Sequence, residues 1–290
     1  MPTAWFLPIT GTIETIKLEH LHGAFTTWLD RPDDADTGEL PVHEAPFKAF
    51  SLAPWSDRSL GPGIRINTVD PSADTYLASR TGAGGTIRFG SAHARYRPVV
   101  PLEHASWQQL GAPLSGLGPV GSAALREVAE PPLDAPGPAN RWEVHFLTPA
   151  TFRGEGRATA LPSVHGILTG LRAKWAQWGP VPIWLTPAEM DAVWVERYDI
   201  HSEAFTIRVS GNDRNGRTLQ HSGAVGAMLF RCDDPAIAGR VDSLFRLAPY
   251  VGVGSRTAWG LGATMLARRG LARPRSARRR DQGRSHGRTG

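Results

Sequence analysis

The first hundred residues contain apolar stretches with two different spacings, one typical of strands and one typical of helices. A short apolar run over 4–9 predicts a strand. The segment 18–29 then has apolar residues three and four positions apart, as in a helix, at Leu18, Leu21, Phe25 and Leu29. Three more strands and one more helix are expected, the strands at 47–54, 64–69 and 86–100 and the helix at 71–79. The resulting β-α-β-β-α-β order is that of a ferredoxin-like domain, which RNA-recognition domains also use.

The same order of elements begins again after a stretch rich in Gly, Pro and Ala over 111–140. Strands are expected at 142–148, within 193–209, at 223–230 and at 262–266, and helices at 162–178 and 235–247. The chain is therefore predicted to be an α+β protein with tandem ferredoxin-like domains. The expected boundaries are a first domain at 1–120, a linker at 121–140, a second domain at 141–267 and a disordered tail at 268–290.

Charge and composition narrow the class of protein. The overall net charge is +5, but the tail from Arg268 onward has nine arginines and one acid, so the rest of the chain has a net charge of about −3. The tail either holds phosphates non-specifically or is a solvated extension, and an RNA site on the folded part must be a local patch. Cys232 is the only cysteine, which excludes an internal disulfide. No apolar run could span a membrane and no secretory signal is present, so a cytoplasmic location is expected.

The segment 252–262 has four glycines in eleven residues, together with one arginine and one threonine. Glycine adopts positive φ without strain and leaves backbone N–H groups open to an anion, so the segment is either a structural turn or a loop that binds phosphate. It lacks the Lys-Ser/Thr ending of a nucleotide-binding P-loop, and no βαβ unit could follow it. The candidate RNA-binding residues in this loop are Gly252, Gly254, Ser255, Arg256, Thr257, Gly260 and Gly262.

Histidines and lysines near the N-terminus are the candidates for proton transfer. His43 and Lys48 lie five residues apart on either side of a proline that favours an extended chain, so both can face one cleft. Histidine exchanges a proton near neutral pH, and lysine supplies a positive charge for a phosphorane. His22 and His20, on the first predicted helix, are the alternatives. No histidine has metal-ligand spacing, and no metal or cofactor is expected.

A third candidate contact is Arg153, which follows a predicted strand that ends in Thr148-Pro149 and continues to Phe152. An exposed aromatic ring and a fixed cation suit base stacking and a phosphate contact, although a plain strand edge would have the same sequence.

Taken together, the motifs resemble those of the CRISPR-associated endoribonucleases that process repeat RNA, the Cas6 family. Three segments carry the resemblance in the family's order, at 146–152, 223–226 and 252–262, and the region 42–51 is similar to the one that bears the family's histidine and lysine. The resemblance covers most of residues 1–267. The chain departs from some members in having no tyrosine at 23–28.

The resemblance implies two ferredoxin-like domains and metal-independent cleavage of CRISPR repeat RNA. A ribose 2′-hydroxyl would attack the adjacent phosphate and leave a 2′,3′-cyclic phosphate and a 5′-hydroxyl. His43 would act as general acid or base and Lys48 would stabilise the phosphorane. Arg256 and the loop amides would hold the RNA. The implied partners are repeat RNA, its crRNA product and subunits of a CRISPR effector complex, with the chain acting as a monomer or homodimer.

Two other functions are compatible with the same parts. One is a non-catalytic RNA-binding subunit of a CRISPR effector complex. The other is a general tandem RNA-recognition protein, which the lack of an aromatic RNA-binding strand pattern in the first domain disfavours.

Overall fold

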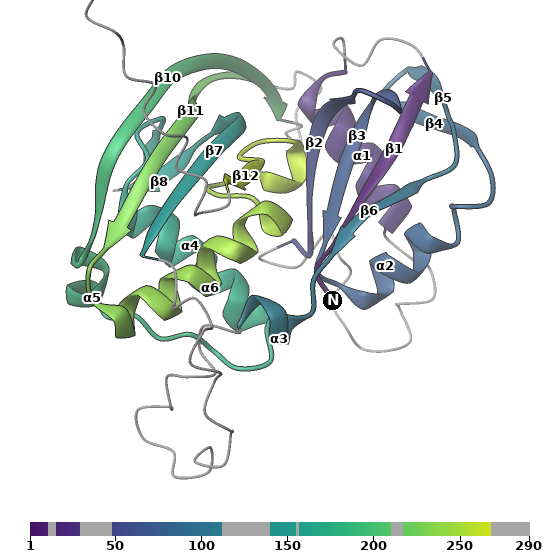
Figure 1. Ribbon diagram of the computed structural model, residues 1–290. Coiled ribbons are helices and arrows are strands. Elements are labelled where there is room, and N and C mark those ends of the chain that lie inside the picture. Colours follow the sequence, from purple (N-terminus) through teal and green to yellow (C-terminus); the bar gives the residue numbers. More distant parts are fainter. Residues whose placement is uncertain (11–15, 30–47, 112–139, 155–156, 210–216, 268–290) are drawn as a thin grey trace, which may run out of the picture.

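The computed structural model describes residues 1–10, 16–29, 48–111, 140–154, 157–209 and 217–267. These form two α+β units, each built on an antiparallel sheet, which lie side by side with the chain passing from one to the other near α3 (Trp107–Leu110) (Figure 1).

The first unit contains the predicted β-α-β-β-α-β order. Its elements are β1 (Thr3–Thr10), α1 (Leu18–Leu29), β2 (Phe50–Asp57), β3 (Gly61–Thr68), α2 (Pro71–Ala78) and β6 (Val100–His104). β1 pairs with β3 on one side and with β6 on the other, which gives the order β2-β3-β1-β6 of a ferredoxin-like sheet. The helix predicted at 18–29 has the bounds that the apolar spacing indicated. The helix α2 begins where Asp70 caps it and Pro71 occupies its first turn.

The single strand expected at 86–100 is wrong. The segment contains β4 (Gly85–Phe89) and β5 (Ala92–Tyr96), which form a hairpin, and β6 follows as a separate strand. The turn of the hairpin includes Gly90 with φ of 62°, a backbone conformation that favours glycine and reverses the chain within two residues. β5 also pairs with the end of β1, so the hairpin extends the first sheet.

The second unit repeats the topology of the first. Its elements are β7 (Arg141–Ala150), α4 (Val164–Trp178), β10 (Val193–Val209), β11 (Arg217–Cys232), α6 (Pro235–Val251) and β12 (Thr264–Ala267). The strand order β10-β11-β7-β12 matches that of the first sheet position by position. Additional short elements that the apolar pattern did not predict are β8 (Phe152–Gly154), β9 (Arg157–Thr159), α5 (Pro187–Asp191) and the 3-10 helix η4 (Thr257–Trp259).

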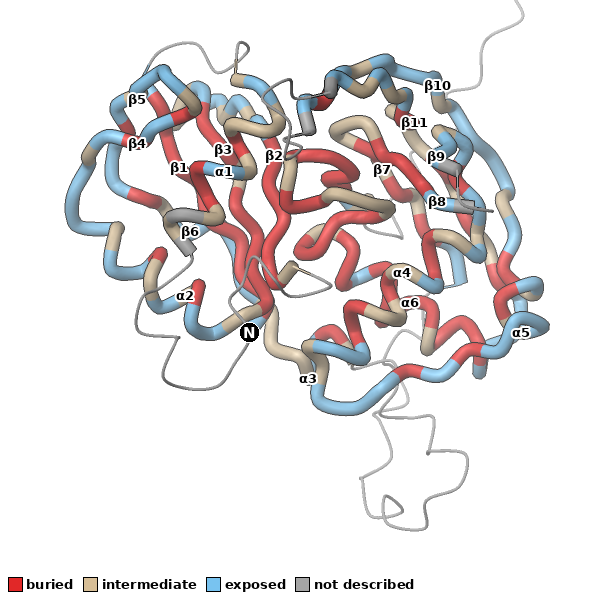
Figure 2. The backbone as a smooth tube through the Cα atoms, turned by 180° about the vertical axis from the view of Figure 1, so that it is seen from behind, coloured by how far each residue is buried: buried red, intermediate tan, exposed pale blue. Residues whose placement is uncertain are grey.

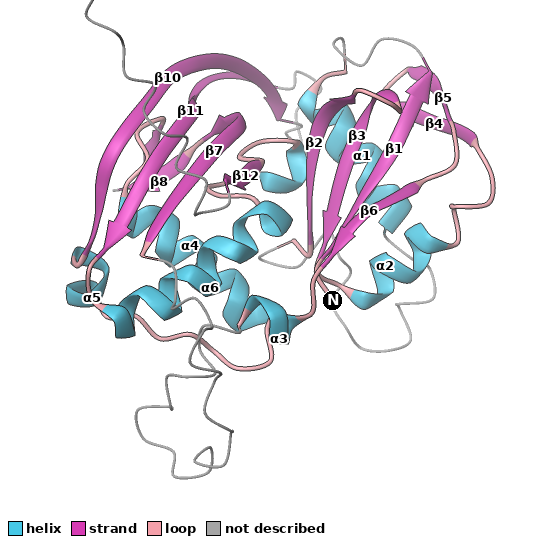
Figure 3. Cartoon of the chain, in the orientation of Figure 1, coloured by secondary structure: helices cyan, strands magenta, loops and turns pink. Residues whose placement is uncertain are grey.

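The core of the second unit lies between its sheet and the helices α4 and α6, which cover the same face (Figure 3). Trp142 and Phe230 from the sheet pack against Phe245 of α6, with ring centroids 5.3 and 5.0 Å apart. The indole N–H of Trp142 donates to the buried carboxylate of Asp242 at 2.7 Å. The helix α3 also packs here, because Trp107 meets the Trp175 ring edge-on.

The two units share an apolar boundary. Ala4, Ala49 and Val69 of the first unit belong to the same buried cluster as the second core, and Ala258 of η4 belongs to the first core. The hydroxyl of Ser51 on β2 donates to the carbonyl of Tyr250 on α6 at 3.1 Å. Figure 2 shows the buried chain continuing from one unit into the other. In the part of the chain that is described, no helix is long and apolar enough to cross a bilayer.

Candidate nucleic-acid interface between the two units

The glycine-rich segment 252–262 connects α6 to β12 along this boundary. All four of its glycines have positive φ, namely Gly252 at 67°, Gly254 at 78°, Gly260 at 91° and Gly262 at 62°. A Cβ at Gly254 would overlap the carbonyl oxygen of Thr151, and one at Gly260 would lie 2.8 Å from a Leu21 methyl group. The glycines therefore serve both the turn and the close approach of α1 and β7 to the loop.

The expectation that the loop amides are open to an anion is wrong for much of the segment. The amide of Ser255 donates to the Thr151 carbonyl at 2.8 Å, and that of Gly262 donates to the Pro149 carbonyl at 3.1 Å. The amides of four further residues in the segment also donate to backbone carbonyls of the protein, those of Gly252, Val253, Trp259 and Gly260. The sequence could not show this, because the acceptors opposite Ser255 and Gly262 lie at the end of β7 and just after it, more than a hundred residues earlier.

A buried lysine fixes the start of the loop. Lys174 on α4 is 6% exposed, and its ammonium donates to the carbonyls of Val251 and Gly252 at 2.8 and 3.0 Å and to the Thr257 hydroxyl at 3.5 Å. Burial lowers the pKa of Lys174 to about 7. Lys174 follows Leu171 by three positions and so lies on the apolar face of α4. The helical spacing in the sequence could therefore have predicted its burial.

His22 brings the first unit into contact with the loop. Its ring stacks on the ring of Trp259, with centroids 4.6 Å apart and an angle of 13° between the planes. Its Nδ1 lies 3.1 Å from the carbonyl oxygen of Ala258. Because a carbonyl oxygen only accepts, Nδ1 carries the proton, and in the neutral ring Nε2 is then the nitrogen with the lone pair.

Among the described candidates for proton transfer, His20 is turned away from this point, and Lys48 lies toward the other end of β2. The ring of His20 lies against Gly90, where an added Cβ would be 2.6 Å from its Cε1, so it faces the β4–β5 turn. Lys48 precedes the first residue of β2, Phe50, whereas the loop packs near Pro54 of the same strand. Phe50 and Pro54 are about 13 Å apart along the strand, and Lys48 lies beyond Phe50. His43 lies outside the described residues.

Two arginines gather beside the loop. The bonds between Ser255 and Thr151 place Arg256 next to Arg153, and burial, followed by the charge of Arg153, lowers the pKa of Arg256. Arg256 also has φ of 58°, the single positive value outside glycine among the described residues. Within the same part of the chain, neither arginine forms an ion pair with a carboxylate. Two like charges held together without a counter-ion favour an anion between them.

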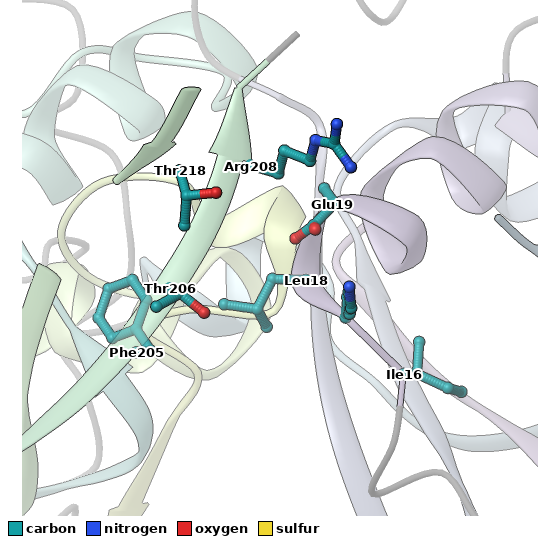
Figure 4. Close-up of a pocket in the computed structure, with 8 residues that line it drawn as sticks. Ile16, Leu18, Glu19, Phe205, Thr206, Arg208 and Thr218 are labelled. Atoms are coloured by element: carbon teal, nitrogen blue, oxygen red, sulfur yellow. The ribbon is translucent and has the colours of Figure 1, made fainter. Parts of the chain in front are cut away.

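A hollow of about 360 Å³ separates the start of α1 from the β10–β11 pair. Figure 4 shows Leu18 and Glu19 of α1 on one side, with Arg208 and Thr206 of β10 facing them. One carboxylate oxygen of Glu19 is buried and has no hydrogen-bond partner among the described residues. Over the same residues, no three His, Cys, Asp or Glu side chains gather into a group that could hold a metal ion.

Comparisons with known proteins agree with this arrangement. Residues 144–264 match the family model of the CRISPR-associated endoribonuclease Cas6. A solved Cas6 product complex is 18% identical with a TM-score of 0.65, and 92% of this chain covers all of that one. A product complex of Thermus thermophilus Cas6 is 22% identical with a TM-score of 0.64 and the same coverage. The comparison with curated protein sequences gives no match.

The fold and the loop define a class of protein with two ferredoxin-like units joined across a glycine-rich segment. The structural likeness covers both units, and the family model covers most of the second unit, including the loop. Over residues 144–264 the chain is similar to the Cas6 family of CRISPR-associated endoribonucleases, and over most of its length it shares the fold of solved Cas6 proteins.

Proposed function

We propose that the chain is an endoribonuclease that cleaves CRISPR repeat RNA without a metal ion. A ribose 2′-hydroxyl attacks the adjacent phosphate, the bond to the 5′-oxygen breaks, and the products end in a 2′,3′-cyclic phosphate and a 5′-hydroxyl. The reaction removes a proton from the 2′-oxygen, delivers one to the leaving 5′-oxygen and needs compensation for the charge on the phosphorane. The match of residues 144–264 to the Cas6 family model and the histidine held against the glycine-rich loop support this proposal.

The observation that carries it is the contact of His22 with Ala258 and Trp259. The carbonyl of Ala258 and the stacked indole fix the ring in one tautomer and one orientation. A general base needs such a fixed ring with its accepting nitrogen, here Nε2, directed at the proton it takes. We therefore infer that His22 takes part in proton transfer. His43 remains the competing candidate from the sequence, and Lys48 remains the candidate for stabilising the phosphorane.

The test uses repeat RNA from the CRISPR array beside the gene, labelled at its 5′ end and incubated with the protein in EDTA. We expect one cut that leaves a cyclic phosphate. The same RNA with a 2′-deoxy sugar just before the cut should bind and remain intact, because it lacks the nucleophile. Normal cleavage of the deoxy substrate would refute the chemistry, and tight binding of unmodified RNA without any cut would indicate a non-catalytic subunit instead.

Single-turnover cleavage by His22→Ala and His43→Ala separates the two histidines. A catalytic general base or acid contributes about 100-fold or more to the rate. His20→Ala is the matched control, because His20 faces the β4–β5 turn. A rate for His22→Ala that equals the wild-type rate would remove His22 from the mechanism.

A further inference from the structure

A second hollow lies in the second unit, between the β8–β9 hairpin and the β10–β11 pair. It measures about 380 Å³ and is lined by Ala158, Ala160, Ala204, Gln220, His221 and Ser222. Alanine side chains on both sides keep it open, and polar side chains come from one strand, β11. A shallow hollow with polar groups along one strand suits a polar ligand.

His221 is the unusual residue of this hollow. Its ring stacks on that of Phe205, its partner across the strands, with centroids 5.9 Å apart. Its Nε2 is buried and has no hydrogen-bond partner among the described residues. Burial, followed by the charge of Arg256, lowers the pKa of His221, so the ring is neutral at pH 7. A buried ring nitrogen without a partner is unfavourable unless a ligand supplies the missing bond.

The two arginines lie at the rim of the same hollow. Arg153 is the cross-strand partner of Ala158, so the two side chains are on one face of the β8–β9 hairpin. Arg256 is close enough to both Arg153 and His221 for its charge to act on each. The hollow therefore combines an aromatic ring and polar groups inside with a pair of unpaired cations outside.

We propose that the hollow around His221 and the pair Arg153–Arg256 form a subsite for one unpaired nucleotide of RNA. The guanidinium groups bind the phosphate, and the base enters the alanine-lined hollow, where its edge meets the side chains of Gln220, His221 and Ser222. A nucleotide fits better than a free phosphate, because a phosphate alone would leave the hollow empty. The inference rests on the proposed function in that it takes the ligand to be RNA.

Photo-crosslinking tests the location directly. The probe is an oligouridylate of about ten nucleotides, a length within the usual range of single-strand sites, with one 4-thiouridine. After irradiation of the full-length protein and digestion, we expect crosslinked peptides that contain residues 220–222 or 158–160. Crosslinks confined to other parts of the chain would overturn the proposal.

Binding of fluorescent homopolymers of the same length tests the roles of the side chains. Arg256→Asn removes the charge with a residue that tolerates positive φ, and Arg153→Gln removes the other charge at an exposed position. Each should weaken binding about tenfold at low salt and reduce the salt dependence by about 0.7 in log–log slope, the loss of one phosphate contact. His221→Phe keeps the stack on Phe205, so it should weaken discrimination among oligo(A), oligo(C) and oligo(U) more than total affinity.

Arg197→Gln is the matched control. It removes one positive charge from an exposed position on β10, where Arg197 faces Glu143, and it should leave affinity within about twofold of wild type. Equal loss of affinity in Arg197→Gln and in both rim variants would mean that only overall charge matters, which would overturn the subsite.

The subsite and the cleavage activity can fail separately. If the wild-type protein crosslinks at 220–222 yet cuts no repeat RNA, the subsite stands and the proposed function fails. If the wild-type protein cuts repeat RNA while the rim variants and His221→Phe bind as the wild type does, the proposed function stands and the subsite fails.

Discussion

Replacing Lys174 with Met should change how the stability of the protein depends on pH. The ammonium of Lys174 is buried between α4 and the end of α6, where three oxygen atoms accept its hydrogen bonds. Burial disfavours the charged form and lowers the pKa of Lys174 from 10.5 to about 7. Methionine has similar length and flexibility but no charge and no donor.

The sign of the effect follows from proton binding. Between about pH 7 and pH 10.5 the unfolded chain keeps the proton on Lys174 and the folded chain releases it. The unfolded state then binds more protons, so the free energy of unfolding rises with pH, by about 1.4 kcal/mol per unit for one group. Over the whole interval the rise is at most about 5 kcal/mol. The three oxygen acceptors favour the ammonium and act against this rise.

The assay is urea unfolding of the wild type and of Lys174→Met at a series of pH values from about 6 to 10. The quantity to plot is the difference between their free energies of unfolding. Other groups in this range, including Cys232, are common to both proteins and cancel. We expect the difference to increase with pH in favour of the wild type. Lys174→Arg keeps its charge over the same range. The difference in free energy of unfolding between Lys174→Arg and Lys174→Met should therefore not increase with pH. Parallel curves for wild type and Lys174→Met would refute the reasoning.

Two further predictions concern glycine and a partly buried ion pair. Gly254→Ala should lower thermal stability strongly, because Gly254 has a φ of 78° and an added Cβ would overlap the Thr151 carbonyl. Gly170 on α4 has open space around it, so Gly170→Ala should stabilise the protein by up to about 1 kcal/mol. Similar melting temperatures for the two variants would contradict this. The backbone amide of Thr186 and the guanidinium of Arg240 lower the pKa of Glu189 to about 2, so its contribution is present above its ordinary pKa and is lost as the pH falls toward about 2. Glu189→Gln should therefore be less stable than wild type near pH 7, by less than about 1 kcal/mol because the pair is still partly open to solvent, and the difference should disappear in acid unfolding curves.

The sequence predicted those elements whose formation depends on neighbouring residues alone. The helix α1 and the capped start of α2 follow from apolar spacing and from Asp70-Pro71, and the central β-α-β-β-α-β order of both units was predicted, although the β4–β5 hairpin and the short elements of the second unit were not. The end of α6 was not. A helix was expected to stop at Leu247, ahead of Pro249, yet it continues to Val251. Proline removes a donor only from its own position, and the last turn here is held from outside by the Lys174 ammonium.

The contacts that build the site were not predictable in the same way. His22 and Ala258 are far apart in the chain, and nothing in either local sequence shows that one bonds to the other. His221 was one of several scattered histidines until β10 placed Phe205 beside it. The glycines correctly marked close backbone approach. The approaching atoms, however, belong to the protein itself at Gly254 and Gly260, which only the fold could reveal.

These contacts decide how loop variants should be interpreted. The segment 252–262 is bonded to Thr151 of the second unit, is held by Lys174 and packs through η4 on α1 and β2 of the first unit. Loss of activity in a glycine variant would therefore be explained first by a disturbed junction between the units, and only then by a lost contact with RNA. Arg256 is the exception, because its side chain is a rim charge while its backbone conformation can be kept by asparagine. Loss of RNA binding by Arg256→Asn at unchanged unfolding free energy would assign the contact to the guanidinium, and a parallel loss of stability would assign it to the junction.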